Sequence, residues 1–328
     1  NRTLPAVLIK LSVLLALVLF GLARFFTAQA VEIQPESIAK ETTKFQRARI
    51  QDIEIAYREA GNPEQPTVVL LHGFPTSSHM FRNLIPRLAK DYHIIAPDYP
   101  GYGASDQPAA DQFDYSFANF ATVINELLEQ KQVQNYVLYV MDYGAPVGFR
   151  LFAKHPERVR GFVIQNGNAY SEGLKEFWDP LKQFWKNPTA ANGNKLRPFF
   201  ELKATKWQWT HGIPKEQKHL VSPDNWIHDQ YLLDRPGNKD IQLRMFLDYG
   251  TNVGEYALWQ NLFRKHQPPA LLVWGKNDVI FPEAGAHPYK RDLNSLEFHL
   301  LDTGHFALET HGRFIARRML AFLKRTRR

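Results

Sequence analysis

From residue 45 onward, the pattern of apolar and polar positions predicts strands that alternate with helices. The segments "KFQRARI" and "IEIAYREAG" alternate apolar and polar residues, as half-buried strands do. The runs "TVVLLH", "YHIIAPD", "NYVLYVM" and "VRGFVIQN" are nearly continuous in apolar residues, which is typical of strands buried in a parallel sheet. Helical patterns lie between them, around residues 80–89, 117–129 and 144–153. This order predicts an α/β fold with a mostly parallel sheet.

The alternation stops near residue 168 and returns at "PPALLVWGKND". The intervening segment has no strand pattern, so we expect a helical insertion. After it come a helix, the strand "LEFHLLD" and an amphipathic helix from residue 306 to about residue 324. The insertion holds six of the seven tryptophans: Trp178, Trp185, Trp207, Trp209, Trp226 and Trp259. Most of them are expected in the core, because large aromatic side chains are usually buried.

The first thirty residues have a different composition. Arg2 and Lys10 precede an uninterrupted apolar run over residues 11–23, and Ala28 and Ala30 form an A-x-A pattern. This succession predicts a secretory signal cleaved after Ala30. The apolar span is also long enough for an uncleaved membrane anchor. Either alternative predicts an exported protein, periplasmic or secreted, or one held at the membrane by residues 1–30, with residues 31–43 as a polar linker.

Composition and charge argue against several classes of function. The net charge of +7 owes much to basic residues near the two ends, and no basic stretch interleaved with aromatic residues suggests nucleic-acid binding. The absence of cysteine excludes disulfides and a cysteine nucleophile. The twelve histidines form no ligand cluster. This holds also for His211, His219 and His228 in the helical insertion, which are irregularly spaced, so we expect no metal and no cofactor. Nothing in the sequence indicates an oligomeric state.

Candidate catalytic residues follow the predicted strands. Asp142 lies in "VMDYGAPVGF", Asp278 in "WGKNDVIFP" and His305 in "DTGHFALE". Taken singly, Asp142 could cap the next helix and Asp278 could form an Asx turn. Together they give the order nucleophile, acid, histidine, each after a different strand, which is the order of an α/β-hydrolase triad. Parallel strands bring such positions to one edge of the sheet.

These motifs, with "HGFP" and "DYPGYGASD", make the chain from about residue 45 resemble an α/β-hydrolase of the epoxide hydrolase and haloalkane dehalogenase branch. The resemblance implies an eight-stranded sheet and a helical cap. The core would comprise residues 44–168 and 266–328, and the cap residues 169–265. A small-molecule substrate is expected under the cap.

An aspartate nucleophile changes the chemistry from that of a serine hydrolase. A carboxylate with a reference pKa near 4 is already ionised at neutral pH and can displace a leaving group from saturated carbon. The product is an ester of Asp142, which His305, held by Asp278, would hydrolyse by activating water. The resemblance implies that the backbone N–H groups of Phe74 and Tyr143 stabilise the oxyanion.

The leaving group separates the subfamilies. Haloalkane dehalogenases usually carry tryptophan after the nucleophile and many carry asparagine after His-Gly, whereas this chain has Tyr143 and Phe74. Fluoroacetate dehalogenases share "HGFP" but place arginines just after the nucleophile, which are absent here. Both differences favour an epoxide hydrolase. Val140, two residues before the nucleophile, is closer to the dehalogenase pattern, so a haloalkane or haloacid dehalogenase stays an alternative.

An epoxide oxygen needs an acid from the cap. The segment "FLDYGTNVGEY" resembles the part of the family's cap that carries the acidic tyrosine, which makes Tyr249 the first candidate and Tyr256 the second. Tyr170 is a candidate for the family's other tyrosine. For halide chemistry, Trp185 and Trp207 are the first candidate donors. A third alternative is an esterase-like or non-catalytic binding protein with a retained triad.

Overall fold

The structure is a computed structural model that describes residues 43–326. The predicted signal peptide or membrane anchor at residues 1–30 lies outside these residues, as does nearly all of the predicted linker, so both stay predictions. Within the described part of the chain, no helix combines the length and the apolar character needed to span a membrane.

One eight-stranded sheet organises the described chain, in the order β1-β2-β4-β3-β5-β6-β7-β8. Strands β1 and β2 pair antiparallel with each other, β2 pairs antiparallel with β4, and all other neighbours are parallel. The predicted fold class is thereby confirmed. The strands are β1 (Lys44–Ile50), β2 (Ile53–Ala60), β3 (Thr67–Leu71), β4 (His93–Pro97), β5 (Tyr136–Met141), β6 (Val159–Gln165), β7 (Ala270–Gly275) and β8 (Leu296–Leu301).

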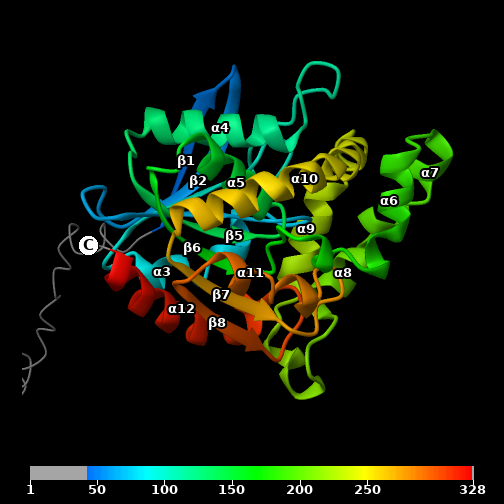
Figure 1. The fold of residues 1–328 in the computed structure, drawn as a ribbon. Helices are drawn as coiled ribbons and strands as arrows, with labels where there is room; N and C mark the ends of the chain where they lie inside the picture. Colours follow the sequence, from blue (N-terminus) through cyan, green and yellow to red (C-terminus); the bar gives the residue numbers. More distant parts are fainter. Residues whose placement is uncertain (1–42, 327–328) are drawn as a thin grey trace, which may run out of the picture. The chain divides into compact units, whose positions relative to one another are not determined.

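Helices cover both faces of the sheet (Figure 1). On one face lie α4 (Phe117–Gln130) and α5 (Gly144–Lys154), and on the other α3 (Ile85–Leu88) and α12 (Ala307–Thr326). Strand β5 is buried on both faces because its side chains alternate between two apolar clusters. Leu138 and Val140 join the cluster under α4 and α5, and Tyr139 joins the one under α12. This explains why the sequence of a central strand is apolar throughout.

Between β6 and β7 the chain forms helices and loops only, and this region is called the cap. Its last helix, α10, crosses back over α5 to reach β7 (Figure 1). The cap elements are η2 (Ser171–Gly173), η3 (Glu176–Trp178), α6 (Asp179–Lys186), α7 (Ala190–Asn194), η4 (Arg197–Phe200), α8 (Leu202–Thr210), η5 (Lys215–Leu220), α9 (Asp224–Leu233) and α10 (Asn238–His266). The core also contains η1 (Ser78–Phe81), η6 (Glu283–Gly285) and α11 (Tyr289–Asp292).

The cap is anchored to the core next to the end of β8. Trp209 of α8 stacks on Phe306, with ring centroids 3.6 Å apart and planes 13° from parallel. Just beyond, the side chain of Asn277 donates a hydrogen bond to the carbonyl of Gly212 at 2.8 Å. These contacts hold α8 against the loop that precedes α12.

Candidate active site

Asp142 lies in the sharp turn from β5 into α5. Its φ of 52° is in the left-handed region, which a non-glycine residue adopts only where the surrounding structure enforces it. Two glycines permit the tight approach of neighbouring backbone. A Cβ at Gly144 would lie 2.2 Å from the carbonyl oxygen of Leu71, and one at Gly73 would lie 2.3 Å from the Cβ of Asp142. The turn therefore presents the carboxylate at the carboxyl edge of the sheet.

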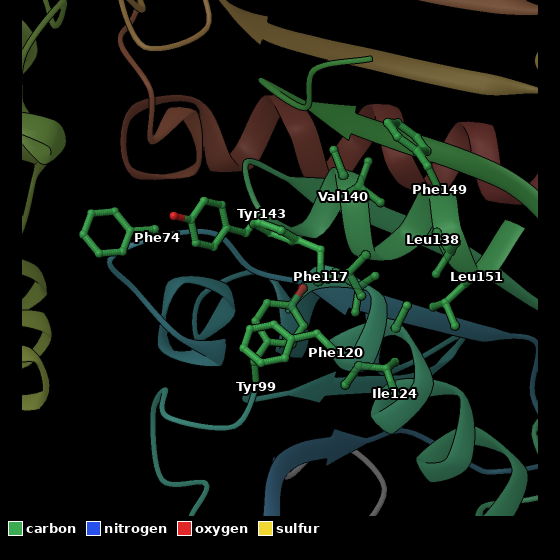
Figure 2. Packing of buried hydrophobic residues seen from close by; sticks show 14 of the residues in the cluster. Phe74, Tyr99, Phe117, Phe120, Ile124, Leu138, Val140, Tyr143, Phe149 and Leu151 are labelled. Atoms are coloured by element: carbon green, nitrogen blue, oxygen red, sulfur yellow. The ribbon is translucent and has the colours of Figure 1, made fainter. Parts of the chain in front are cut away.

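Backbone donors surround the Asp142 carboxylate. The N–H of Phe74 donates to Oδ1 at 2.7 Å, and the N–H of Tyr143 also hydrogen-bonds to the carboxylate. These are the two donors expected for an oxyanion hole. The rings of Phe74 and Tyr143 lie side by side with centroids 5.9 Å apart, beyond the end of β5 where Leu138 and Val140 pack inward (Figure 2). The aromatic rings thus shield the donors from water.

The structure brings the three candidate triad residues together. Nδ1 of His305 is 2.6 Å from Oδ2 of Asp278, and Nε2 of His305 is 3.7 Å from Oδ2 of Asp142. All three side chains are buried, Asp142 at 4% exposure and His305 at 2%. The predicted convergence of Asp142, Asp278 and His305 at one edge of the sheet is therefore what the chain forms.

Residues at the end of β6 hold the acid and the histidine in place. Asn166 donates from Nδ2 to Oδ2 of Asp278 at 2.8 Å, and Gln165 donates from Nε2 to the carbonyl of His305 at 3.0 Å. The other oxygen of Asp278 accepts from the N–H of Ile280 at 2.8 Å. Sequence reasoning missed both amides. The sequence feature that could have indicated them is the polar Gln-Asn pair at the end of a buried strand.

Burial and charge set the protonation of the site. Burial raises the pKa of Asp142 to about 6, against the opposing effect of His305 and of the N–H groups of Phe74 and Tyr143. Burial lowers the pKa of His305, but the charge and hydrogen bond of Asp278 outweigh it, and the net shift is upward. The pKa values of both groups are thus raised above their usual values. Perturbed values of this kind are common at catalytic sites.

A small cavity of about 30 Å³ adjoins Asp142. Substrate pockets usually measure roughly 300–1,000 Å³, so the cap is closed over the carboxylate and must move to admit a substrate. The walls are mostly aromatic. They comprise Phe74, Asp142, Tyr143, Phe177, Trp178, Leu181, Phe199, Gln208, Phe246 and Ile280.

Tyr249 of α10 lies buried behind this wall. Its ring is 5.9 Å from that of Tyr143 and 4.5 Å from that of Trp178. Burial raises the pKa of Tyr249 well above its usual value, and the neighbouring Tyr256 and Asp142 raise it further. The phenol therefore keeps its proton at neutral pH, in electrostatic reach of the carboxylate.

Residues 66–312 match the family model described as the alpha/beta hydrolase fold. The chain belongs to the α/β hydrolase fold family. It is 44% identical over 283 residues to the uncharacterized hydrolase YNR064C of Saccharomyces cerevisiae, covering 85% of this chain and 96% of that protein. A haloalkane dehalogenase of Bradyrhizobium diazoefficiens is 37% identical over 121 residues, 37% of this chain and 38% of that one. The solved structure of the epoxide hydrolase CorEH superposes with a TM-score of 0.70 at 18% identity, over 86% of this chain and 99% of that one. The chain is thus similar in fold to an epoxide hydrolase and, over part of its length, similar in sequence to a haloalkane dehalogenase.

The two remaining tyrosine candidates, Tyr256 and Tyr170, lie in different surroundings. Tyr256 lies beside Tyr249, and its hydroxyl accepts a hydrogen bond from Asn168 at 2.9 Å. Tyr170 does not line the cavity, because its hydroxyl donates to Asp292 at 2.8 Å and its ring packs against Tyr289. Tyr249 and Tyr256 thus form a pair, and the structure does not bring Tyr170 into it.

The two tryptophans singled out from the sequence also lie outside the cavity wall. The indole N–H of Trp185 donates to the carbonyl of Phe246 at 2.7 Å, and the ring of Trp207 stacks on Phe177, itself a wall residue. The tryptophan that does line the cavity is Trp178, which sequence reasoning did not select. The sequence did not indicate Trp178, because the packing of the six tryptophans depends on how the cap helices cross.

The hydrolase holds no evident metal centre in its described part: within residues 43–326, no three histidine, aspartate or glutamate side chains converge in a suitable cluster. The histidine of "HGFP", His72, has a structural role instead. Burial lowers the pKa of His72 to about 4, and its ring accepts from the N–H of Tyr99 at 3.3 Å. A neutral His72 thus joins the loops after β3 and β4.

Proposed function

We propose that the protein is an epoxide hydrolase that opens an epoxide to a diol through an ester of Asp142. The observation that carries the proposal is the position of Tyr249, a protonated phenol buried close to a carboxylate nucleophile. A general acid near the nucleophile is what an epoxide requires, because an unassisted alkoxide leaves poorly at neutral pH.

In the first step, an oxygen of ionised Asp142 attacks one epoxide carbon. The carbon–oxygen bond of the ring breaks, and its electron pair goes to the ring oxygen, which takes the proton of Tyr249. Tyr256 lies next to Tyr249 and is held by Asn168, so a second phenol is available to hydrogen-bond the phenolate once it forms. This step leaves an alkyl ester on Asp142.

In the second step, Nε2 of His305 removes a proton from water, and the hydroxide attacks the carbonyl carbon of the ester. The N–H groups of Phe74 and Tyr143 already contact the Asp142 carboxylate and would hold the negative oxygen of the tetrahedral intermediate. Collapse breaks the bond to the alkoxide, which takes the proton of the new Asp142 carboxylic acid, so the diol leaves and the carboxylate is regenerated. The proton held by His305 returns through solvent to the Tyr249 phenolate, which closes the cycle. Asp278 keeps the imidazole oriented and stabilises its positive charge.

Haloalkane dehalogenation is the second candidate, and the sequence similarity to a haloalkane dehalogenase favours it. It needs N–H or O–H donors for a halide next to Asp142. The indole N–H of Trp178, in the cavity wall, is already committed to the carbonyl of Ile280 at 2.5 Å. The hydroxyl of Tyr143 has no hydrogen-bond partner among the described residues and is the better placed donor. A halide would therefore depend on this one hydroxyl, whereas an epoxide would take the proton of Tyr249, and this difference favours the epoxide.

Parallel assays on matched epoxides and bromoalkanes test the choice. We expect diol formation to exceed halide release with substrates of the same carbon skeleton. A single turnover in heavy-oxygen water should place the label in the Asp142 carboxylate, because water attacks the carbonyl of the ester and not the substrate carbon. Faster halide release than diol formation would assign the protein to the dehalogenases, and label found only in the product would rule out the ester.

A further inference from the structure

Gln208 of α8 is a polar side chain in the otherwise largely apolar wall around Asp142. It is buried at 6% exposure and lines the cavity together with aromatic and aliphatic residues. Its amide forms no hydrogen bond with any described residue. Gln208 lines the cavity, and neither its oxygen nor its nitrogen is among the fully enclosed polar atoms that lack a partner, so the amide is open to a ligand in the cavity. A polar group that no protein group satisfies is available to hydrogen-bond such a ligand.

The other buried glutamines show how unusual this is. Gln165, Gln230 and Gln242 are the other glutamines among the buried residues described. Gln230 of α9 accepts from the hydroxyl of Thr205 at 2.8 Å and donates to the carbonyl of Phe200 at 3.1 Å. Gln165 and Gln242 are likewise hydrogen-bonded through both their oxygen and their nitrogen atoms. Each of these three buried glutamines is therefore hydrogen-bonded through both its oxygen and its nitrogen, and Gln208 is not.

The backbone at Gln208 is held rigidly. The next residue, Trp209, stacks on Phe306 and donates its indole N–H to Oδ2 of Asp229 at 2.8 Å. Beyond α8, the carbonyl of His211 lies so close to Gly304 that a Cβ there would be 1.9 Å from it. The backbone on either side of Gln208 is thus packed against the loop that carries His305.

We propose that Gln208 selects substrates by hydrogen-bonding a neutral polar group near the reacting carbon, such as a hydroxyl or an ether oxygen. This inference rests on the proposed epoxide hydrolase function and names its substrate class. The group recognised is not an anion, since no lysine, arginine or histidine lines the cavity, and a cation would pair with the Asp142 carboxylate instead of with Gln208. Sites that hydrogen-bond a substrate group discriminate strongly against analogues that lack it, because the protein group is then left unpaired.

Glycidol and 1,2-epoxybutane are suitable probes, because they differ only in a hydroxyl in place of a methyl group. The measurement is kcat/KM for each with wild type and with Gln208→Met, which keeps the length of the side chain and removes its hydrogen bonds. We expect the ratio of glycidol to epoxybutane to fall by about 10-fold or more in the variant. The loss should fall on glycidol, with epoxybutane unchanged or improved.

Thermal unfolding provides a second readout that does not depend on any substrate. Gln208→Met removes an amide that has no hydrogen-bond partner in the described chain, so we expect Tm to stay the same or rise. Gln230→Met is the contrasting control, because it removes the partner of the Phe200 carbonyl and one of the two partners of the Thr205 hydroxyl, and it should lower Tm.

The outcomes separate the two proposals. An unchanged substrate ratio, or a lower Tm in Gln208→Met, would overturn the role of Gln208 while leaving epoxide hydrolysis intact. A wild-type protein that turns over neither epoxide and forms no ester would overturn the proposed function and the substrate class with it. An unchanged or higher Tm together with a lost preference for glycidol supports both.

Discussion

Nε2 of His305 lies 3.7 Å from Oδ2 of Asp142, too far for a hydrogen bond but close enough for strong electrostatic attraction. The same nitrogen has no hydrogen-bond partner among the described residues, whereas Nδ1 is held by Asp278. His305 is therefore oriented by one carboxylate and left free to act beside the other. This suits a base that works on water after the nucleophile has reacted.

Replacing His305 with glutamine should separate the two chemical steps. Attack by Asp142 needs no base, so the ester should still form, but its hydrolysis should slow by roughly 10²–10⁴-fold because the general base is gone. Intact-protein mass spectrometry with an epoxide should show a mass increase of one substrate. The adduct should map to the peptide that contains Asp142.

Asp142→Asn is the control for this experiment, because an amide cannot displace the leaving group and no adduct should appear. Two results would contradict the assigned roles. One is normal turnover by His305→Gln, and the other is an adduct that persists in Asp142→Asn. Rapid ester formation without any turnover in wild type would show that His305 does not activate water.

The donor of the leaving-group proton is tested by Tyr249→Phe. We expect kcat/KM for epoxides to fall by roughly 10-fold or more, while turnover of a bromoalkane, if present, should be unaffected. Tyr143→Phe is the matched comparison, since it removes a second buried phenol but keeps the N–H of the oxyanion hole. A larger loss of epoxide turnover in Tyr143→Phe than in Tyr249→Phe would move the acid to Tyr143.

The fold and the triad were predictable because local sequence determines them. Apolar runs that alternate with helical patterns specify a parallel sheet, and the order Asp142, Asp278, His305 after successive strands places the three side chains at one edge. The two oxyanion donors followed from the same positions, since a glycine before Phe74 and a tight turn at Asp142 orient backbone groups.

The cap was less predictable because its contacts are nonlocal. Tyr170 is close in sequence to β6, but a carboxylate 122 residues away, Asp292, captures its hydroxyl. Trp178 and Gln208 reach the cavity only because short helices cross above Asp142. A helical pattern tells which residues are buried and not which cavity they face. Ranking cap residues therefore required the structure.

The pH dependence of the two steps should differ. Ester formation needs ionised Asp142, whose pKa is about 6, so the single-turnover rate should fall as pH drops through 6. Ester hydrolysis needs neutral His305, whose pKa is raised above its usual value, so steady-state turnover should fall at a higher pH than ester formation does. No loss of activity at alkaline pH is expected near neutrality, because the pKa of Tyr249 lies well above its usual value.

Rapid-quench rates measure the pH dependence of ester formation, and steady-state rates measure that of turnover, both between pH 5 and 9. Identical profiles for the two steps would contradict the assignment.

Asp229 should make the stability of the protein depend on pH. This carboxyl is buried between Trp209 and the Arg82–Glu309 ion pair, and burial raises its pKa to about 7. The folded protein then holds the proton up to about pH 7, whereas an unfolded chain releases it near pH 4. Between these values the folded state binds more protons, so the contribution of Asp229 to the free energy of unfolding should fall as pH rises from about 4 to 7.

Asp229→Asn tests this, because the amide oxygen can still accept from Trp209 but carries no charge. We expect the variant to exceed wild type in Tm above pH 7 and to match it near pH 4, with kcat/KM unchanged at neutral pH. Asp229→Ala is the contrasting variant: it leaves the indole N–H of Trp209 unpaired beside Phe306, and Tm should fall at every pH. Because Phe306 follows His305, that loosening should also lower kcat. A difference in Tm between Asp229→Asn and wild type that stays constant from pH 4 to 8 would show that Asp229 does not titrate in this range.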